Sequence, residues 1–288
     1  MPGTLFVVAT PIGNLEDLSF RALRTLREVD LIAAEDTRRT SKLLAHYEIR
    51  KSMVSLHEHN EHREAPRLAA RLERGESIAL VTDAGTPGIS DPGAHLVRLA
   101  RERQVPVSPI PGPSAVMAAL SVSGFPADRF AFLGFPPRSG SARRDWFARA
   151  KAESSVVVLF EAPHRIRQTL DDLANIFGKR PIQVHRELTK INEELVIYTN
   201  SEPAQSVKEL GEFVVVVGES IEETDHDQDE QSLAKAVLMF GCMTTSAAFD
   251  SGEAVALTAK AMDLDEQIVR KAVKKHKIAE NQRRQSLP

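Results

Sequence analysis

Two aspartates, three glycines and two prolines follow an apolar run in the first third of the chain. The run, residues 77–81, predicts a short buried strand with Asp83 at its carboxyl end. The glycines between 83 and 93 allow the backbone to approach a ligand closely, and the prolines stiffen the loop. Open α/β sheets bind their ligands at this end of the strands, so the segment predicts a ligand-binding loop. The same residues also fit an ordinary turn in which Asp91 caps the next helix.

Other predicted strands of the N-terminal part end in polar loops of the same kind. Apolar runs alternate with helical patterns, which indicates an α/β domain with a mostly parallel sheet. Four of the runs end in Thr10-Pro11-Ile12-Gly13, Glu35-Asp36-Thr37-Arg38, Asp83-Ala84-Gly85-Thr86 and Pro111-Gly112-Pro113-Ser114. A nucleotide-like ligand fits such a ring of loops. The pyrophosphate fingerprint G-x-G-x-x-G is absent from the first loop, which argues against a dinucleotide site.

Turn-forming residues and aromatics between 124 and 137 predict a hinge into a second domain. Strands expected at 156–160, 182–184 and 213–217, with fewer helices between them, indicate a mixed sheet. Charged clusters follow the first two of these strands and comprise Glu161, His164 and Arg165, then Arg186, Glu187 and Lys190. Taken alone, each cluster is typical of ion pairs on a protein surface. If both face the loops of the first domain, they line an interdomain cleft, a usual place for a site.

The stretch His57-Glu58-His59-Asn60-Glu61-His62 raises the question of a metal. Its spacing does not match H-E-x-x-H, because Glu61 lies four residues after His57 and His62 five. The sequence has no cysteine cluster or second His/Asp cluster to complete a ligand set. We therefore expect a polar loop near the ligand and no metal.

A basic segment after the hinge could contact nucleic acid. Arg138, Arg143 and Arg144 lie beside Trp146 and Phe147, and this combination suits phosphate contacts and base stacking. The serine–glycine–serine stretch among them would let the segment fold onto a partner. The alternative is an amphipathic helix with both aromatic rings in the core.

The C-terminal part reads as an acidic linker followed by three helices, the last two resembling a helix-turn-helix unit. The helices are expected at about 232–240, 252–261 and 265–276. Lys271, Lys274 and Lys275 make the last helix strongly basic. RNA contact and a solvated helix end with favourable charges explain these lysines equally well.

Composition limits the class of protein. The chain has 288 residues, enough for two domains, and a formal net charge of −3, so any nucleic-acid contact must come from local patches. A single cysteine, Cys242, excludes an intramolecular disulfide and indicates a reducing compartment. We find neither a signal peptide nor an apolar run long enough to span a bilayer, so we expect a soluble cytoplasmic protein with no membrane partner.

Motifs of both domains, taken in order, resemble the tetrapyrrole-methylase superfamily. In the first domain they are Val8-Ala9-Thr10-Pro11-Ile12-Gly13-Asn14-Leu15, Ala34-Glu35-Asp36-Thr37-Arg38, His57-Glu58-His59-Asn60, Asp83-Ala84-Gly85-Thr86-Pro87, Ser90-Asp91-Pro92-Gly93 and Pro111-Gly112-Pro113-Ser114-Ala115. In the second they are Phe160-Glu161-Ala162-Pro163-His164-Arg165 and Arg186-Glu187-Leu188-Thr189-Lys190. Within the superfamily they are similar to the branch that methylates the ribose 2′-hydroxyl of cytidine 1402 in bacterial 16S ribosomal RNA. The resemblance covers residues 5 to about 218.

The resemblance implies two α/β domains with S-adenosylmethionine in the cleft between them, a homodimer, and 16S ribosomal RNA in the small ribosomal subunit as partner. We expect an N-terminal domain over 1–117, a second domain over 118–220, a linker over 221–231 and a helical extension over 232–288. The implied cofactor-binding residues are Pro11, Gly13, Asp83, Ala84, Gly85, Thr86, Asp91, Pro111, Ser114, Ala115, Leu133, Gly134, Phe135, Phe160, Glu161, Ala162 and Gly211.

Methyl transfer to a ribose hydroxyl is a displacement at the sulfonium methyl, and holding the hydroxyl in line supplies much of the acceleration. The hydroxyl is a poor acid, so a base, or a cation that lowers its pKa, should help. We expect Lys190 and Glu187, then Arg165 and Asp36, in this role. A methylase of a small tetrapyrrole and a non-catalytic RNA-binding protein on the same fold are the alternatives. The basic segments argue against the tetrapyrrole methylase.

Overall fold

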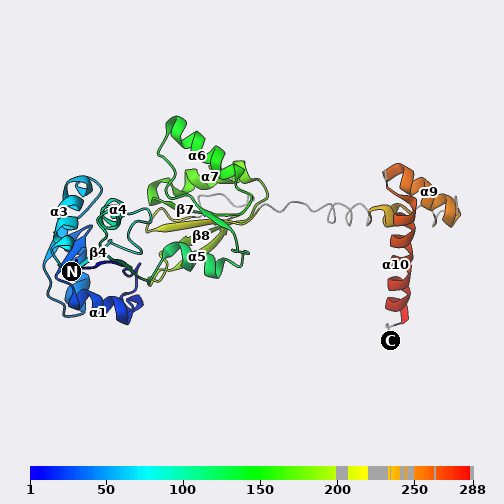
Figure 1. The fold of residues 1–288 in the computed structure, drawn as a ribbon. Helices are drawn as coiled ribbons and strands as arrows, with labels where there is room; N and C mark the ends of the chain where they lie inside the picture. Colours follow the sequence, from blue (N-terminus) through cyan, green and yellow to red (C-terminus); the bar gives the residue numbers. More distant parts are fainter. Residues whose placement is uncertain are drawn as a thin grey trace. The chain divides into compact units, whose positions relative to one another are not determined.

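The structure is a computed structural model that describes residues 1–198, 207–219, 233, 235–240, 244, 250–262 and 264–285. The chain divides into two compact units, Met1–Ser220 and Ile221–Pro288. The first unit contains two five-stranded sheets, and the described part of the second is helical (Figure 1). The linker predicted over 221–231 lies outside the described residues.

A five-stranded parallel sheet forms the N-terminal part of the first unit, as predicted. Its order, β3-β2-β4-β1-β5, puts β4 at the centre between β2 and β1. The strands are β1 (Leu5–Val8), β2 (Leu31–Ala34), β3 (Met53–Ser55), β4 (Ile78–Val81) and β5 (Val107–Ile110). The helices between them are η1 (Leu15–Asp17), α1 (Phe20–Glu28), α2 (Thr37–His46), α3 (Glu61–Glu73) and α4 (Ala94–Glu102).

Strand β4 is apolar throughout because helices cover both of its faces. Ile78 and Leu80 belong to the core formed with α3 and α4, whereas Ala79 and Val81 belong to the core formed with α1 and α2. The strand therefore has no solvated face, and its first polar side chains come in the loop after it.

Helix α2 begins at Thr37, directly after the polar residues that follow β2. The Asp36 side chain accepts a hydrogen bond from the backbone N–H of Arg38 (2.8 Å), so Asp36 is its N-cap. In the motif Glu35-Asp36-Thr37-Arg38, Glu35 therefore lies in the loop, Asp36 caps the helix, and Thr37 and Arg38 form its first turn.

The second sheet is mixed, also as predicted, with the order β6-β7-β10-β8-β9. Strand β6 is parallel to β7, and the other neighbours are antiparallel. The strands are β6 (Phe130–Phe132), β7 (Val156–Glu161), β8 (Ile182–Arg186), β9 (Glu194–Tyr198) and β10 (Phe213–Val217). The helices are α5 (Ala115–Ser123), α6 (Gly140–Ala152), η2 (Pro163–Arg165) and α7 (Ile166–Phe177).

Helices cover both faces of this sheet. Helix α5 packs on one face, where Val116 and Leu120 meet Val214 and Val216 of β10. Helices α6 and α7 pack on the other face. The sequence pattern did not predict α5, β6 or β9: α5 is apolar nearly all round, β6 is short, and β9 is a partly exposed edge strand.

The base-stacking interpretation of the basic segment was wrong. Trp146 and Phe147 are 5% and 7% exposed and belong to the core of the second sheet, where the Trp146 indole N–H donates to the Leu133 carbonyl (3.0 Å). Arg143 is buried as well. Its guanidinium donates to the Pro137 carbonyl (3.0 Å) and forms an ion pair with Asp172 (2.7 Å). The segment is the amphipathic helix α6, which was the alternative interpretation.

In the second unit, α9 (Ser251–Met262) and α10 (Glu266–Gln285) form a small core with Ala236 and Phe240. Lys271, Lys274 and Lys275 are exposed on α10. In neither unit does a described helix combine the length and apolar composition needed to cross a membrane.

Candidate functional site

A cavity of about 390 Å³ lies between the two sheets of the first unit. Its walls come from the loops after β2 and β4, the start of α5 and strands β7, β8 and β10. The predicted cofactor-binding residues that line it are Asp83, Ala84, Gly85, Thr86, Asp91, Ser114, Ala115, Phe135, Phe160, Glu161, Ala162 and Gly211. Loops more than a hundred residues apart in sequence therefore meet at one site, at the strand ends where we expected a ligand.

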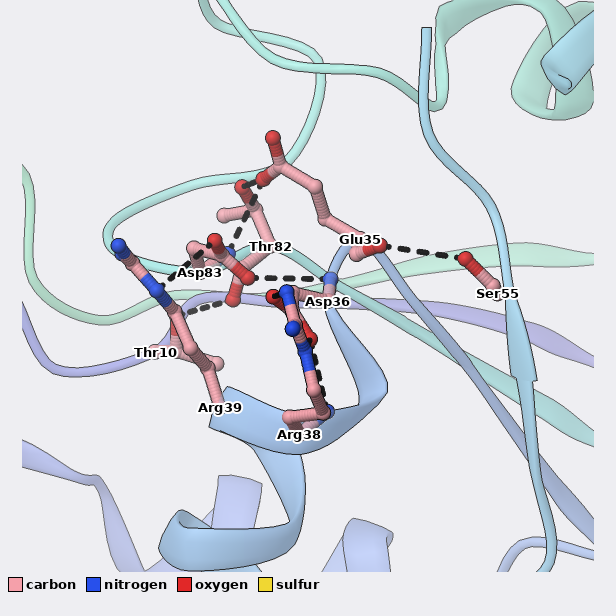
Figure 2. A network of polar contacts seen from close by, with 8 residues as sticks. All are labelled: Thr10, Glu35, Asp36, Arg38, Arg39, Ser55, Thr82 and Asp83. Carbon is pink, nitrogen blue, oxygen red and sulfur yellow. Dashed lines mark hydrogen bonds and ion pairs between the residues drawn. The ribbon is translucent and has the colours of Figure 1, made fainter. Parts of the chain in front are cut away.

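Carboxylates on the first-domain wall bind the ends of the central strands together (Figure 2). Glu35 Oε2 accepts hydrogen bonds from Thr82 Oγ1 (2.6 Å) and from the Asp83 backbone N–H (3.2 Å). Asp83 Oδ1 in turn accepts from the Asp36 backbone N–H (3.1 Å). Thr10 Oγ1 donates to the Thr82 carbonyl (3.0 Å), which adds the end of β1 to this network.

Negative charge accumulates on this wall. Arg39 lies 3.4 Å from Asp83 Oδ2 and is mostly exposed. Burial, and then the charge of Glu35, raises the pKa of Asp91 to about 7. The same two causes raise the pKa of Asp83. The wall therefore favours a ligand that brings positive charge.

The second-domain wall is mainly apolar. Val214 of β10 is paired with Phe160 of β7 on one side and with His185 of β8 on the other, and all three line the cavity. Residues directly opposite each other on neighbouring strands project to the same face of a sheet. The Phe135 ring lies 5.4 Å from that of Phe160, which extends the aromatic surface.

Beside this surface, Glu161 is 2% exposed and fully paired. Its carboxylate lies 2.5 Å from Arg165 and accepts hydrogen bonds from Thr169 Oγ1 (2.6 Å) and the Ala162 backbone N–H (2.7 Å). A buried carboxylate with this many donors holds the start of η2 and α7 in place.

Residues 4–204 match the family model of tetrapyrrole (corrin/porphyrin) methylases. The chain belongs to this family. It is 52% identical over 222 residues to "Ribosomal RNA small subunit methyltransferase I" of Xylella fastidiosa, an alignment that covers 75% of this chain and 81% of the relative. Proteins of the same name from Halalkalibacterium halodurans (48% identical, 76% of this chain and 78% of the relative) and Escherichia coli O157:H7 (45%, 79% and 82%) are also similar.

Solved structures share the fold of this methylase-family chain at low identity. Uroporphyrin-III C-methyl transferase from Thermus thermophilus, complexed with S-adenyl homocysteine, is 20% identical with a TM-score of 0.53, covering 76% of this chain and 99% of that one. Diphthine synthase is 17% identical with a TM-score of 0.57, covering 75% and 90%. These likenesses show the α/β fold of the family.

The other predicted cofactor-binding residues, Pro11, Gly13, Pro111, Leu133 and Gly134, lie outside the lining. Gly13 contacts the second domain instead: a Cβ there would lie 2.5 Å from Lys190 Cγ. The neighbouring Asn14 backbone N–H donates to Thr189 Oγ1 (3.1 Å). The first loop thus fixes the two domains of the methylase to each other.

None of the four predicted catalytic residues is among the described residues that line the cavity, but Lys190 and Glu187 contact residues that do. Lys190 Nζ donates to Glu187 Oε1 (2.8 Å) and lies 3.0 Å from Glu212, a lining residue. Gly211, also in the lining, has φ +98° and touches Glu187, so only glycine fits there. Two other predicted residues are held elsewhere: Arg165 by Glu161, and Asp36 by Arg38.

Protonation states at the cavity edge follow from these contacts. Burial by itself would lower the pKa of Lys190, but its hydrogen bonds to Glu187 and Glu212 outweigh this and raise it. The hydrogen bond from Lys190 lowers the pKa of Glu187. Lys190 is therefore an ammonium and Glu187 a carboxylate at neutral pH.

Several lining residues were not predicted. Ser90 and Leu188 lie inside the quoted motifs, so their positions carried a signal that we did not use. Glu35 lies in one of the four strand-end loops that we expected around a ligand, although it was not among the predicted cofactor-binding residues. Arg39 and His185 lie one residue outside a motif, and no pattern marked them.

The histidine-rich stretch contributes to loop structure. Asn60 Oδ1 accepts from the His57 backbone N–H (2.8 Å), and Glu61 Oε1 accepts from the backbone N–H groups of Gly93 and His95 (both 2.9 Å). Glu61 thereby ties α3 to the start of α4. The described residues contain no group of three or more His, Cys, Asp and Glu side chains that could hold a metal.

A second hollow, of about 620 Å³, lies between α6 and α7. Arg138, Arg144 and Lys151 line it together with Gln168 and Asn175. Asp172 and the apolar Phe147 and Ile176 also line it.

Replacing Asp91 with asparagine should change how the stability of the ligand-free protein depends on pH. Because the pKa of Asp91 is raised in the folded state, its contribution to stability is complete below about pH 4 and is lost as the pH rises through about 7. Asparagine does not ionise, so the Asp91→Asn variant does not lose stability as the pH rises. Near pH 8 its free energy of unfolding should exceed that of the parent by about 1–2 kcal/mol, a range that allows for the partial exposure of the side chain.

Urea unfolding near pH 5 and near pH 8 measures this difference. Asp128→Asn, at an exposed aspartate, is the matched control. An Asp91→Asn variant whose stability relative to the parent is the same at both pH values would contradict the expectation.

Proposed function

We propose that this chain is an S-adenosylmethionine-dependent methyltransferase of small-subunit ribosomal RNA. The observation that carries the proposal is the cavity, because its lining is formed by the methylase motifs of a chain 42–52% identical to relatives of that name. We further infer that its target is the ribose 2′-hydroxyl of cytidine 1402 in 16S ribosomal RNA, as the motif resemblance implies. Small ribosomal subunits lie in the bacterial cytoplasm, so the protein acts there.

The cavity residues fit S-adenosylmethionine. The cofactor carries a sulfonium and an ammonium group, and the wall with Glu35, Asp83 and Asp91 supplies negative charge. Its adenosine needs apolar surface, which Phe160 and Val214 supply. When bound, the cofactor supplies an electrophilic methyl group on a positively charged sulfur.

Residues beside the cavity would prepare the acceptor hydroxyl. The acceptor hydroxyl must give up its proton as its oxygen takes the methyl group, and a nearby ammonium lowers the pKa of that hydroxyl, so that the proton passes more readily to solvent water. We assign this role to Lys190, which is protonated and is held by Glu187 and Glu212. Glu187 fixes the position of the ammonium. We assign Arg165 and Asp36 to positioning roles. Arg165 pairs with Glu161, and Asp36 binds Arg38 and caps α2.

The RNA would bind outside the cavity, on basic surfaces. Arg138 and Arg144 are exposed at the hollow between α6 and α7. Arg143 is not assigned to RNA binding, because its side chain is buried and forms an ion pair with Asp172. Lys271, Lys274 and Lys275 give the C-terminal unit a separate basic face.

We infer a homodimer from exposed apolar side chains on the second domain. Met117 and Val122 of α5 and Ile197 of β9 are more than half exposed, and Leu195 of β9 is about half exposed. Gln183 of β8 donates to the Ser123 carbonyl at the end of α5, so the helix lies close to the β8–β9 edge. Apolar side chains gathered in one region mark a protein interface.

Transfer of labelled methyl from S-adenosylmethionine to small ribosomal subunits, with naked 16S RNA alongside, tests the function. We expect one ribose 2′-O-methyl group at cytidine 1402, found by mapping the modified nucleotide. Cofactor binding without transfer to either RNA would contradict the RNA substrate and favour the small-tetrapyrrole methylase.

Lys190→Met should lower kcat for methyl transfer by about a hundredfold, because the acceptor hydroxyl loses the ammonium that lowers its pKa. Glu187→Gln should have a smaller effect, since the amide still accepts from Lys190. The exposed Lys42→Met is the control. If Lys190→Met transfers methyl groups at the parent's rate when the cofactor is saturating, the role assigned to Lys190 is contradicted.

Substitutions of two neighbouring arginines of α6 should have different effects, one on the affinity for RNA and the other on the stability of the fold. Arg144→Glu should weaken binding of 16S RNA several-fold and leave the unfolding free energy unchanged, since Arg144 is exposed. Arg143→Ala should lower the unfolding free energy by about 2–3 kcal/mol, because Asp172 and Thr169 lose a charged donor. Filter binding and urea unfolding measure both. Arg149→Glu, on α6 but outside the hollow, is the control, and equal loss of affinity there would contradict the assignment.

A further inference from the structure

His185 is a buried polar side chain with an unused hydrogen-bonding atom. It is 1% exposed, and its Nε2 has no hydrogen-bond partner among the described residues. Leaving such an atom unpaired costs about 1–3 kcal/mol. Buried polar atoms are nearly always paired, so an exception at a cavity points to a partner that the protein binds.

Its place in the second sheet directs His185 to the cavity. The side chains of Phe160, Val214 and His185 form one cross-strand row, and each of the three lines the cavity. The first two are apolar, so His185 is the polar member of this row. Glu35, Arg39, Asp83 and Asp91 line the cavity from the first sheet. The two carboxylates that the second sheet adds to the lining, Glu161 and Glu212, are paired with Arg165 and Lys190.

The imidazole is neutral at physiological pH, because burial lowers the pKa of His185 and the charge of Glu193 offsets this only partly. A neutral ring nitrogen either donates or accepts one hydrogen bond, according to its tautomer. It therefore suits an uncharged polar group on a flat, largely apolar ligand. Adenosine has both features: an aromatic base with ring nitrogens and an amine, and a ribose with hydroxyls.

We propose that His185 Nε2 forms a hydrogen bond with the adenosine part of the bound cofactor. This inference rests on the proposed function and deepens it. The base lies against the apolar row, where the cofactor's charged methionine part would lose its solvation without compensation. His185 is then a positioning residue that recognises the adenosine.

Calorimetric titration with S-adenosylhomocysteine tests the proposal. His185→Phe should bind it about five- to tenfold more weakly than the parent, while His185→Gln keeps a hydrogen-bonding group and recovers part of the loss. Two altered probes, S-inosylhomocysteine and the 2′-deoxyribose analogue, separate base from ribose. The parent should discriminate against the probe that lacks the contacted group, and His185→Phe should lose that discrimination.

Val214→Ala is the matched control, since it enlarges the cavity in the same row without removing a polar atom. It should weaken all three probes equally and keep the parent's discrimination. If His185→Phe keeps the parent's affinity and discrimination, the proposal is overturned. A parent chain that fails to bind S-adenosylhomocysteine would instead overturn the proposed function.

A measurement on the parent protein covers the case in which His185→Phe does not fold. With ¹⁵N-labelled histidine, the Nε2 resonance of His185, assigned by its absence in His185→Gln, should shift when S-adenosylhomocysteine is added. An unchanged Nε2 resonance in the saturated protein would overturn the proposal.

Discussion

The cavity depends on how the backbone groups at the ends of parallel strands are paired. Beyond the last residue of β4, a β-bridge between Thr10 and Gly85 continues the backbone pairing with the end of β1, and side chains pair the backbone groups on the β2 side. Glu35 accepts from the hydroxyl of Thr82 and the backbone of Asp83, and Asp83 accepts from the backbone of Asp36. These contacts fix the ends of β2 and β4 together, so the acidic wall has one shape before any ligand binds (Figure 2).

The opposite wall has a different basis. Strands β7, β8 and β10 provide an apolar face, and the buried Glu161 anchors the segment that follows β7. Gly13 lets the two walls come close, because a side chain there would collide with Lys190. Gly211 leaves room for Glu187 within the second wall. A charged wall facing an apolar one suits a ligand with a charged end and a flat end.

Membership of the methylase family and the cavity support each other. The family model covers strands β1 to β9, and the cavity lies where motifs from both sheets meet. Within the first unit, Arg138, Arg144 and Lys151 line the hollow between α6 and α7 and are not among the residues that line the cavity.

The sequence by itself determined the two sheet types, the loops that carry Asp83 and Asp91, and the family, because strand-end motifs are local and keep their order along the chain. It did not determine the role of Arg143, Trp146 and Phe147, since a basic aromatic stretch reads alike on an RNA surface and on an amphipathic helix. Only packing against α7 decided it. His185 became visible only in the tertiary structure, because a strand pattern does not reveal whether a neighbouring strand leaves one nitrogen unpaired. Pairing of polar atoms depends on residues far apart in sequence, and folding alone brings them together.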